Sequence, residues 1–474
     1  MAVRAPKAAD PRFLASLADA VPQSVWLDVP NAPQPSSALV GDVRCDLLVV
    51  GGGFTGLWTA LQAKEDDPSL DVVLVEGREV GWAASGRNGG FVASSLTHGL
   101  LNGVERFPDE METLEHLGAQ NLQGIEDSLV RYGIDAEWEL NGELTVANEP
   151  WQLEHLAAIP ELARRYGGSV ELWDADRIQA EVASPTYLGA AYEATGTALV
   201  NPAKLCWGLR RACLELGVRM YERTEVTALS DESGQMVATT AYGRVRAAKV
   251  ALGTNVFPNL VKRARPYVVP VWDYVLATEP LTADQLASIG WKRRQGIGDS
   301  SNQFHYYRLT ADNRILWGGY DAIYYYGNGM DSRHEQRPET YAKLAEHFFT
   351  TFPQLDGVRF SHAWGGAIDT CTRFCAFWGQ AYGGKVAYVG GYTGLGVGAT
   401  RFGARVLLDL LSGRPTARTE LRFVRSKPVP FPPEPVRFAG VQLTRWSIDR
   451  ADRNDGRRNP WLRTLDRLGL GFDS

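Results

Sequence analysis

Residues 45–76 read Cys-Asp-Leu-Leu-Val-Val, then Gly51-Gly-Gly-Phe-Thr-Gly56 and, after a helix-like segment, Asp71-Val-Val-Leu-Val-Glu76. This pattern predicts a strand, a glycine turn, a helix and a second strand, which together begin an α/β fold. Such a turn presents backbone N–H groups and the positive end of a helix dipole to a pyrophosphate. The stretch therefore predicts a binding site for an adenine dinucleotide; the alternative is a glycine-rich turn without a ligand.

Each glycine of the turn has its own predicted role. Gly51 allows the tight turn, Gly53 lets a ligand approach the backbone, and Gly56 lets helix and strand pack closely. Glu76 stands twenty residues beyond Gly56, where a carboxylate accepts hydrogen bonds from a ribose diol. The neighbouring residues expected to bind the same ligand are Phe54, Thr55 and Gly77.

Two further glycine-rich runs suit a flat ring system. Trp82-Ala-Ala-Ser-Gly-Arg-Asn-Gly-Gly90 follows Glu76 with too little chain between them for an ordinary helix. Its small residues and paired glycines suit a backbone that lies against a ring. Gly390-Gly-Tyr-Thr-Gly-Leu-Gly-Val397 again precedes a helix-like segment, so a second helix N-terminus is expected beside the same ring.

These motifs, together with Trp364-Gly-Gly366, resemble those of the D-amino-acid-oxidase-like flavoprotein superfamily, and most of all its gamma-glutamylputrescine oxidoreductase group. The resemblance extends from about Trp26 to the end of the chain. It implies an α/β fold in which a Rossmann-like FAD-binding domain of the glutathione-reductase type joins an α+β substrate domain with a mixed or antiparallel sheet. FAD is the implied cofactor.

The resemblance also assigns residues to the flavin. Some members tether it through a cysteine just before the stretch that here reads Trp364 to Thr370, and no cysteine stands there, so the FAD is expected to be noncovalent. No metal site is expected, because Cys371 and Cys375 have no matching cysteine or histidine pair. The implied flavin contacts are Ser85, Gly86, Arg87, Asn88, Gly89, Val226, Gly253, Asn255, Thr393, Gly394, Leu395, Gly396 and Val397.

The implied division of the chain is discontinuous. The FAD-binding domain comprises residues 41–101, 185–260 and 362–415, and the substrate domain residues 102–184 and 261–361. Residues 1–40 form an N-terminal appendage, and residues 416–474 a C-terminal arm and tail. Periodicity and turn residues predict a short helix near Phe13, a hairpin around Asn141-Gly142, a helix from Pro202 to Leu216, a strand from Val218 to Leu229, a strand from Val269 to Thr278, a hairpin from Phe304 to Gly319 and a helix from Thr444 to Arg450.

Substrate specificity is expected in the region from Val268 to Trp364. The candidate catalytic residues there are Trp364, Tyr274 and Arg308. Aromatic side chains over a flavin suit an amine or its alkyl chain, and the arginine is a candidate to hold a substrate carboxylate. The alternative is that the aromatic residues form a sheet core and the arginine braces its hairpin.

The expected chemistry is transfer of hydride from a carbon next to nitrogen to flavin N5, giving an imine that hydrolyses. A lysine that helps oxygen react in some family oxidases has no counterpart in the strand Arg314 to Gly319. A dehydrogenase with another electron acceptor therefore stays open beside an oxidase. A flavoprotein that uses NAD(P)H is disfavoured by the lack of a second dinucleotide fingerprint, and a non-catalytic flavin-bound interaction protein is the remaining alternative.

Composition limits the classes of protein to which the chain can belong. The 474 residues are 45% hydrophobic and 22% charged, with a net charge of −6, which argues against nucleic acid as a partner. Five scattered cysteines form no disulfide framework and indicate a cytoplasmic location. Residues 1–20 lack the apolar core of a signal peptide, and no transmembrane span is expected.

The C-terminal tail has leucines and a tryptophan at helical spacing, namely Trp461, Leu465 and Leu468. This spacing predicts that the tail docks on the body or on a neighbouring subunit, which leaves an oligomer open.

Overall fold

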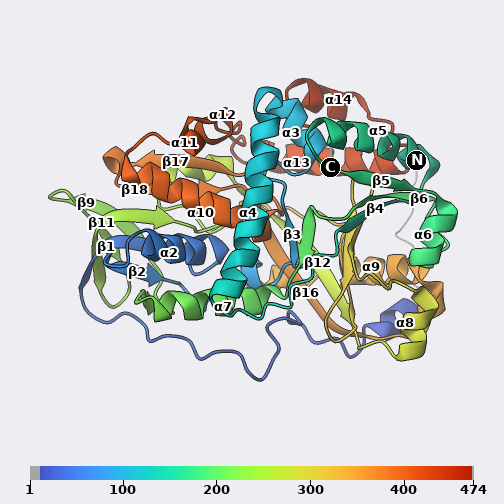
Figure 1. The fold of residues 1–474 in the computed structure, drawn as a ribbon, viewed down its shortest axis with the longest axis horizontal. Helices are drawn as coiled ribbons and strands as arrows, with labels where there is room; N and C mark the ends of the chain where they lie inside the picture. Colours follow the sequence, from blue (N-terminus) through green and yellow to red (C-terminus); the bar gives the residue numbers. More distant parts are fainter. Residues whose placement is uncertain (1–10, 472–474) are drawn as a thin grey trace.

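Two eight-stranded sheets form the two halves of the computed structural model, which describes residues 11–471 (Figure 1). The first sheet has the strand order β17-β18-β11-β1-β2-β8, extended from β11 by β10 and β9. Its central strands pair in parallel, with Leu48 opposite Val73 on one side and Val250 on the other, as their continuous Val and Leu runs predict. The strands are β1 Val43–Val50, β2 Val72–Val75, β8 Arg219–Tyr221, β9 Ala228–Glu232, β10 Gln235–Thr239, β11 Arg244–Leu252, β17 Phe377–Ala381 and β18 Val386–Gly390.

Three helices cover one face of the first sheet. α2 (Phe54–Asp66), α7 (Pro202–Glu215) and α10 (Gly396–Ser412) pack together there (Figure 1). Leu57 and Leu407 of these helices form one buried cluster with Val49 of the sheet. Because α2 follows β1 and α10 follows β18, both helix N-termini lie at the carboxyl edge of the sheet, where ligands bind in open α/β folds.

The second sheet is mixed, with the order β16-β12-β15-β14-β13-β4-β6-β5. Its neighbouring strands are antiparallel except for β13 and β4, which are parallel. The two sheets together confirm the predicted fold class. The strands are β4 Glu143–Ala147, β5 Val170–Trp173, β6 Gly189–Glu193, β12 Val269–Thr278, β13 Gly296–Asp299, β14 His305–Leu309, β15 Ile315–Gly319 and β16 Phe360–Thr370.

One face of the second sheet packs on helices. These are α1 (Pro11–Ser16), α6 (Ala175–Glu181), α8 (Ala283–Ile289) and α9 (Pro338–Thr351), and their apolar side chains share a cluster with the sheet. The predicted N-terminal helix docks here through Phe13, whose ring stacks on Phe349 at 5.7 Å. The other face of the sheet turns toward the first half of the molecule.

The junction between the halves is crossed by α4 (Met111–Arg131), which packs on α10 (Figure 1). A small antiparallel sheet of β3 (Phe91–Ala93) and β7 (Thr197–Leu199) lies at the same junction. The other helices are α3 Leu100–Arg106, α5 Pro150–Arg165, α11 Ala417–Glu420 and α12 Arg422–Arg425, and short 3₁₀ turns lie at η1 Ala84–Gly86, η2 Pro108–Glu110, η3 Lys262–Tyr267, η4 Ser332–Glu335, η5 Pro353–Leu355 and η6 Tyr382–Gly384.

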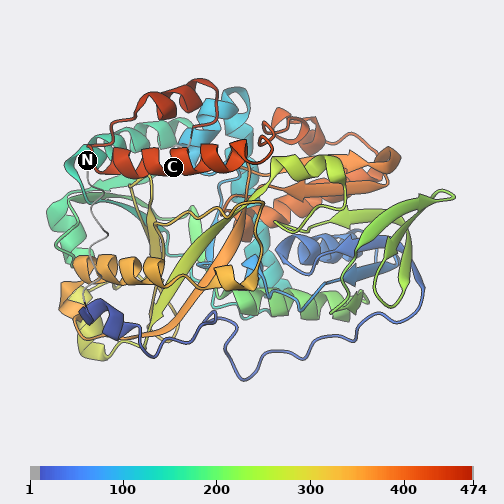
Figure 2. The same ribbon diagram turned by 180° about the vertical axis from the view of Figure 1, so that it is seen from behind.

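Beyond α12 the chain crosses to the substrate half. It forms α13 (Val436–Asp452) and α14 (Pro460–Arg467), which lie along the top of that half (Figure 2). Asp452 accepts hydrogen bonds from the backbone N–H groups of Asn302 and Gln303, both at 3.0 Å. The tail thus docks on the body of its own chain, which is one of the two predicted alternatives.

Two local predictions are wrong. The hairpin around Asn141-Gly142 keeps only its second strand, because β4 pairs with β6 and β13, and the residues before the turn make one isolated bridge between Glu139 and Leu199. The strand from Val218 to Leu229 is divided into β8 and the start of β9 by a loop. The helix predicted from Thr444 to Arg450 is confirmed, and it extends further in both directions as α13.

The sheets also shift the expected division of the chain. β6 and β16 belong to the second sheet, so the chain leaves the substrate half after residue 193 and after residue 370, later than the predicted boundaries. In residues 11–471 no helix is long and apolar enough to cross a membrane. The expectation about a signal peptide rests partly on residues 1–10, which lie outside the described residues.

Candidate active site

A cavity of about 890 Å³ lies between the two halves. This volume is within the range of small-molecule and cofactor sites. One wall is formed by turns at the carboxyl edge of the first sheet, a second by the inward face of the second sheet, and a third by the C-terminal segment (residues 429–471). The first wall is built mainly from backbone turns and helix ends, and the other two mainly from side chains.

The first wall begins at the N-terminus of α2. A Cβ on Gly51 would lie 2.5 Å from the carbonyl oxygen of Gly253, and one on Gly56 would collide with the carbonyl oxygen of Gly51. Both positions therefore require glycine. Gly53 is the N-cap of α2 and offers no side-chain cap, so the positive end of this helix opens on the cavity that Gly53, Phe54 and Thr55 line.

Glu76 stands behind this turn at the end of β2. Its carboxylate accepts hydrogen bonds from the backbone N–H groups of Gly52 (2.6 Å) and Arg78 (2.8 Å) and from the indole of Trp82 (2.9 Å). Burial raises its pKa. Oε2 receives only the Gly52 donor among these bonds, so it keeps a lone pair that can accept a ribose hydroxyl.

Six of the predicted cofactor residues lie behind the main cavity wall rather than on it. Gly51 and Gly56 serve the packing just described, and a Cβ on Gly86 would collide with the Gly81 carbonyl. The loop after β8 runs beside the end of β2, where the Thr224 N–H donates to the Glu76 carbonyl at 2.7 Å. The residues of this second layer are Gly51, Gly56, Glu76, Gly77, Gly86 and Val226.

The other predicted cofactor residues line the cavity itself. They come from the first helix turn, the loop of residues 84–90, the end of β11 and the turn before α10. Sequence-distant segments are thus brought onto one wall. These residues are Gly53, Phe54, Thr55, Ser85, Arg87, Asn88, Gly89, Gly253, Asn255, Thr393, Gly394, Leu395, Gly396 and Val397.

The loop of residues 84–90 is held rigidly. The Asn88 side chain donates to the carbonyl oxygens of Ala84 (2.9 Å) and Ser85 (3.0 Å) and accepts from the Gly90 N–H (2.8 Å). Two buried indoles fix the carbonyl groups of the same loop. Trp364 donates to Arg87 at 2.8 Å, and Trp26 of the N-terminal segment donates to Asn88 at 2.9 Å.

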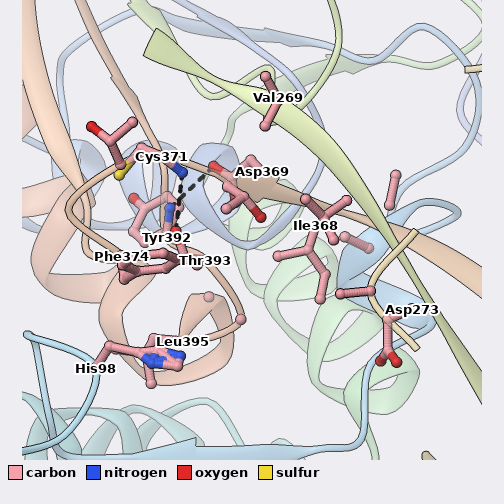
Figure 3. A pocket seen from close by; sticks show the side chains of 18 of the residues that line it. His98, Val269, Asp273, Ile368, Asp369, Cys371, Phe374, Tyr392, Thr393 and Leu395 are labelled. Atoms are coloured by element: carbon pink, nitrogen blue, oxygen red, sulfur yellow. Dashed lines mark hydrogen bonds between the residues drawn. The ribbon is translucent and has the colours of Figure 1, made fainter. Parts of the chain in front are cut away.

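The turn before α10 is anchored from the second sheet. The Asp369 carboxylate accepts from the N–H groups of Gly391 (2.7 Å) and Tyr392 (3.2 Å), and Figure 3 shows it beside this turn. Burial raises the pKa of Asp369 to about 7. α10 has no side-chain cap, and a Cβ on Gly394 would meet nothing within 4 Å, so the helix N-terminus faces open cavity.

The second wall is the inward face of the second sheet. Alternation along β12 places Val271, Asp273 and Val275 in the cavity. The ring of Tyr306 from β14 also lines it, and its hydroxyl donates to Asp273 Oδ2 at 2.5 Å. Reasoning from the sequence counted Tyr306 among the aromatic residues of this region but did not single out Asp273, although a single acid in an otherwise apolar strand was a usable signal.

The three predicted catalytic residues do not line the cavity. Tyr274 lies on the opposite face of β12, fully buried, and its hydroxyl donates to the His334 carbonyl at 2.8 Å. The Arg308 guanidinium, 1% exposed, donates to the Val200 carbonyl at 2.7 Å and so braces the join of the halves. Trp364 holds the carbonyl of Arg87. Their contacts are those of packing and positioning residues.

The third wall comes from the C-terminal segment. Its extended arm contributes Val429 to Pro432, α13 contributes Arg437, Arg445 and Ile448, and α14 contributes leucines. Arg445 pairs with Asp321, another cavity residue, at 3.1 Å. This wall covers the side of the cavity that the two sheets leave open.

Two uncapped helix N-termini, a fixed acidic residue at the end of β2 and a ring-sized glycine loop define the site of a dinucleotide-dependent flavoenzyme. The sequence model of the family described as FAD dependent oxidoreductase matches residues 46–410. The chain belongs to this family, and its cofactor is FAD.

Individual relatives agree with this assignment. Gamma-glutamylputrescine oxidoreductase of Escherichia coli (strain K12) is 34% identical over 394 residues, which are 81% of this chain and 87% of that protein. The probable oxidoreductase OrdL of Haemophilus influenzae is 26% identical over 402 residues, covering 82% and 88% of the two chains. The crystal structure of glycine oxidase from Geobacillus kaustophilus shares the fold, with a TM-score of 0.67 at 17% identity over 81% of this chain and 99% of that one.

The residues present fit FAD. The open end of α2 suits the pyrophosphate, and Glu76 has a free lone pair for the ribose. The open end of α10 and the space above Gly394 suit the polar edge of the flavin ring. The cysteine nearest this turn, Cys371, is buried and its thiol donates to backbone carbonyl oxygens.

Proposed function

We propose that this chain oxidises the carbon–nitrogen bond of an amine, giving an imine that hydrolyses to a carbonyl compound and a free amine. The observation that carries this proposal is the charge on the substrate wall. The inward face of β12 is apolar apart from Asp273, and no basic side chain of residues 11–471 pairs with that carboxylate. A wall of this kind attracts a cationic amine and its alkyl chain. The name of the Escherichia coli relative also indicates an amine.

The protein's part in the reaction follows from the three walls. Bound FAD supplies an acceptor for hydride. The sheet face positions the carbon–hydrogen bond, the N-terminus of α10 favours negative charge on the nearby edge of the ring, and the C-terminal segment excludes water. We propose that the FAD is noncovalent, because Cys371 and Cys375 are both buried, with their pKa values raised by burial.

A dehydrogenase that uses an acceptor other than oxygen is the second candidate. No lysine lines the cavity in the part of the chain that the structure describes, and Arg87 is paired with Glu335 at 2.7 Å. Positive charge beside the flavin would help oxygen to accept electrons, and these residues supply little of it.

Anaerobic mixing tests the proposal. The purified flavoprotein is mixed with alkylamines, N-methylamines and amino acids, and separately with NADPH, while the visible flavin band is followed. Bleaching by an amine supports the proposal; bleaching by NADPH alone, or by none of these, contradicts it. Readmission of air then separates an oxidase, which recovers its colour at once, from a dehydrogenase. Yellow colour in the supernatant after acid precipitation supports a noncovalent flavin.

A further inference from the structure

Asp273 differs from the other acids around it. Asp321 pairs with Arg445, and Asp299 is bound by His305 at 2.6 Å, so both have basic partners. Asp273 is held only by neutral donors, which are the Tyr306 hydroxyl, the N–H of Tyr274 at 2.8 Å and the N–H of Gly319. A carboxylate kept in an apolar wall without a cation is costly, and such groups concentrate at functional sites.

The Asp273 carboxylate is held by Tyr306, whose ring packs between two glycines. The Tyr306 ring lies between Gly89 of the flavin loop and Gly318 of β15, since a Cβ on either glycine would come within 2.7 Å of its atoms. Gly366 stands opposite Asp273 on β16. The strand residue opposite Asp273 thus has no side chain to cover the carboxylate. Tyr306, which donates a hydrogen bond to that carboxylate, contacts the flavin loop. Figure 3 shows Asp273 on the far side of Ile368 from the α10 turn.

We propose that Asp273 binds the ammonium group of the substrate and accepts its proton before hydride transfer, and that Tyr306 positions the Asp273 carboxylate. This proposal rests on the proposed amine oxidation. One N–H bond of the ammonium breaks, its electron pair stays on nitrogen, and an O–H bond forms on Asp273. Hydride then leaves the adjacent carbon for FAD, so the substrate loses two electrons and FAD gains them. Asp273 returns its proton to water before the next turnover.

The two other unpaired acids of the cavity are less suited to this role. The Asp369 carboxylate already accepts hydrogen bonds from two backbone N–H groups of the turn before α10. Glu143 on β4 accepts from the Thr197 hydroxyl at 2.9 Å and stands directly across from Glu193. Burial raises the pKa of Glu143 to about 7, so it resembles Asp273 in environment and differs in place. Glu143→Gln is therefore the matched control.

The ionisation of Asp273 gives the reaction a testable pH dependence. Burial raises its pKa to about 6, while hydrogen bonds from Tyr306 and from two backbone N–H groups oppose this shift and nearby Asp321 adds to it. The proton acceptor is the ionised form. The rate of flavin reduction by an alkylammonium substrate therefore rises as pH increases through about 6.

The test compares wild type, Asp273→Asn, Tyr306→Phe and Glu143→Gln by anaerobic stopped flow between pH 5 and 9, with an amine that reduces the wild-type flavin. We expect reduction at pH 7 to slow at least about 100-fold in Asp273→Asn and roughly tenfold in Tyr306→Phe. The step near pH 6 disappears from Asp273→Asn, whose rate follows only the free amine, and it persists in Glu143→Gln. An unchanged pH profile in Asp273→Asn overturns the inference while amine oxidation stands. If no amine reduces the wild-type flavin, the proposed function itself fails.

Ligand binding gives a readout that needs no turnover. tert-Butylamine has no hydrogen on the carbon bound to nitrogen, so it cannot lose hydride. Its binding is followed through the visible flavin spectrum in weak buffer with a pH indicator. We expect Kd to rise at least about tenfold in Asp273→Asn, with release of about one proton per site that wild type retains. Equal affinity and equal proton release in the two proteins contradict the inference. Where Asp273→Asn fails to hold FAD, Tyr306→Phe carries both measurements.

Discussion

The wall that faces the cofactor and the walls that face the substrate are built by different means. The first uses backbone N–H groups, helix ends and glycines, and a Cβ on Gly56 would make its closest approach, to the carbonyl oxygen of Gly51. The others use side chains, among them Asp273 and Tyr306 from separate strands and Arg445 from the C-terminal segment. A backbone site needs glycine at fixed spacing, so the sequence displays it. A side-chain site depends on which face of a strand a residue occupies, which the sequence displays weakly.

The largest effect on FAD binding is expected where the cofactor wall has no room for a side chain. Gly56→Ala places a Cβ against the Gly51 carbonyl, which must move away from the pyrophosphate site. We expect the Kd for FAD, measured by fluorescence titration of the apoprotein, to rise at least about 100-fold with far-UV circular dichroism retained. Gly168→Ala is the control, since its nearest neighbours stand at ordinary contact distances. An unchanged FAD affinity in Gly56→Ala would mean that the turn relaxes freely.

A smaller effect is expected for Trp364, which links the two kinds of wall. Trp364→Phe keeps the ring in the core and removes the hydrogen bond to the Arg87 carbonyl. The loss of about 1 kcal/mol should weaken FAD binding roughly fivefold and leave the limiting rate of flavin reduction nearly unchanged. A catalytic residue would show the reverse, with FAD affinity preserved and the rate reduced. Measuring both quantities on one preparation separates a positioning role from a catalytic one.

The smallest effect is expected in the third wall. Arg445→Met breaks the pair with Asp321, which keeps its hydrogen bond from the Thr340 hydroxyl at 2.7 Å. We expect KM to change about threefold while kcat and FAD affinity stay within about twofold, as for an interaction made equally in ground and transition states. Steady-state kinetics and FAD titration check this. A large drop in kcat would place the C-terminal segment in the chemistry rather than around it.

The sequence predicted the elements that carry the first wall for a physical reason. β1, the turn, α2 and β2 are consecutive, so their geometry follows from local pattern, and the loop of residues 84–90 and the turn before α10 both stand out by their glycines. β12 was also predicted with its observed bounds. The sequence did not show which face of β12 points into the cavity. Tyr274 was chosen for its aromatic ring, although it occupies the face opposite to Asp273. The face that carries Tyr274 packs against α9, where its ring lies 5.8 Å from that of Tyr341, and the local sequence pattern does not show this contact.

The substrate walls could not be predicted from the sequence, because they depend on contacts between residues far apart in the chain. The residues before Asn141 have good strand composition, yet β4 finds its partners in β6 and β13. The C-terminal arm reads as an appendage, and nothing local shows that it crosses the opening between the sheets. The same holds for Trp26, whose indole reaches the flavin loop from a proline-rich lead-in. Such contacts join residues tens to hundreds of positions apart.

The position of the C-terminal wall has a consequence for biosynthesis. Residues 429–471 emerge from the ribosome after both sheets and every cofactor turn, and they lie beyond the region matched by the family, which ends at residue 410. Both sheets and every cofactor turn can therefore assemble while the chamber still stands open. The vitamin-derived coenzyme can enter through this opening during translation, before residues 429–471 close it.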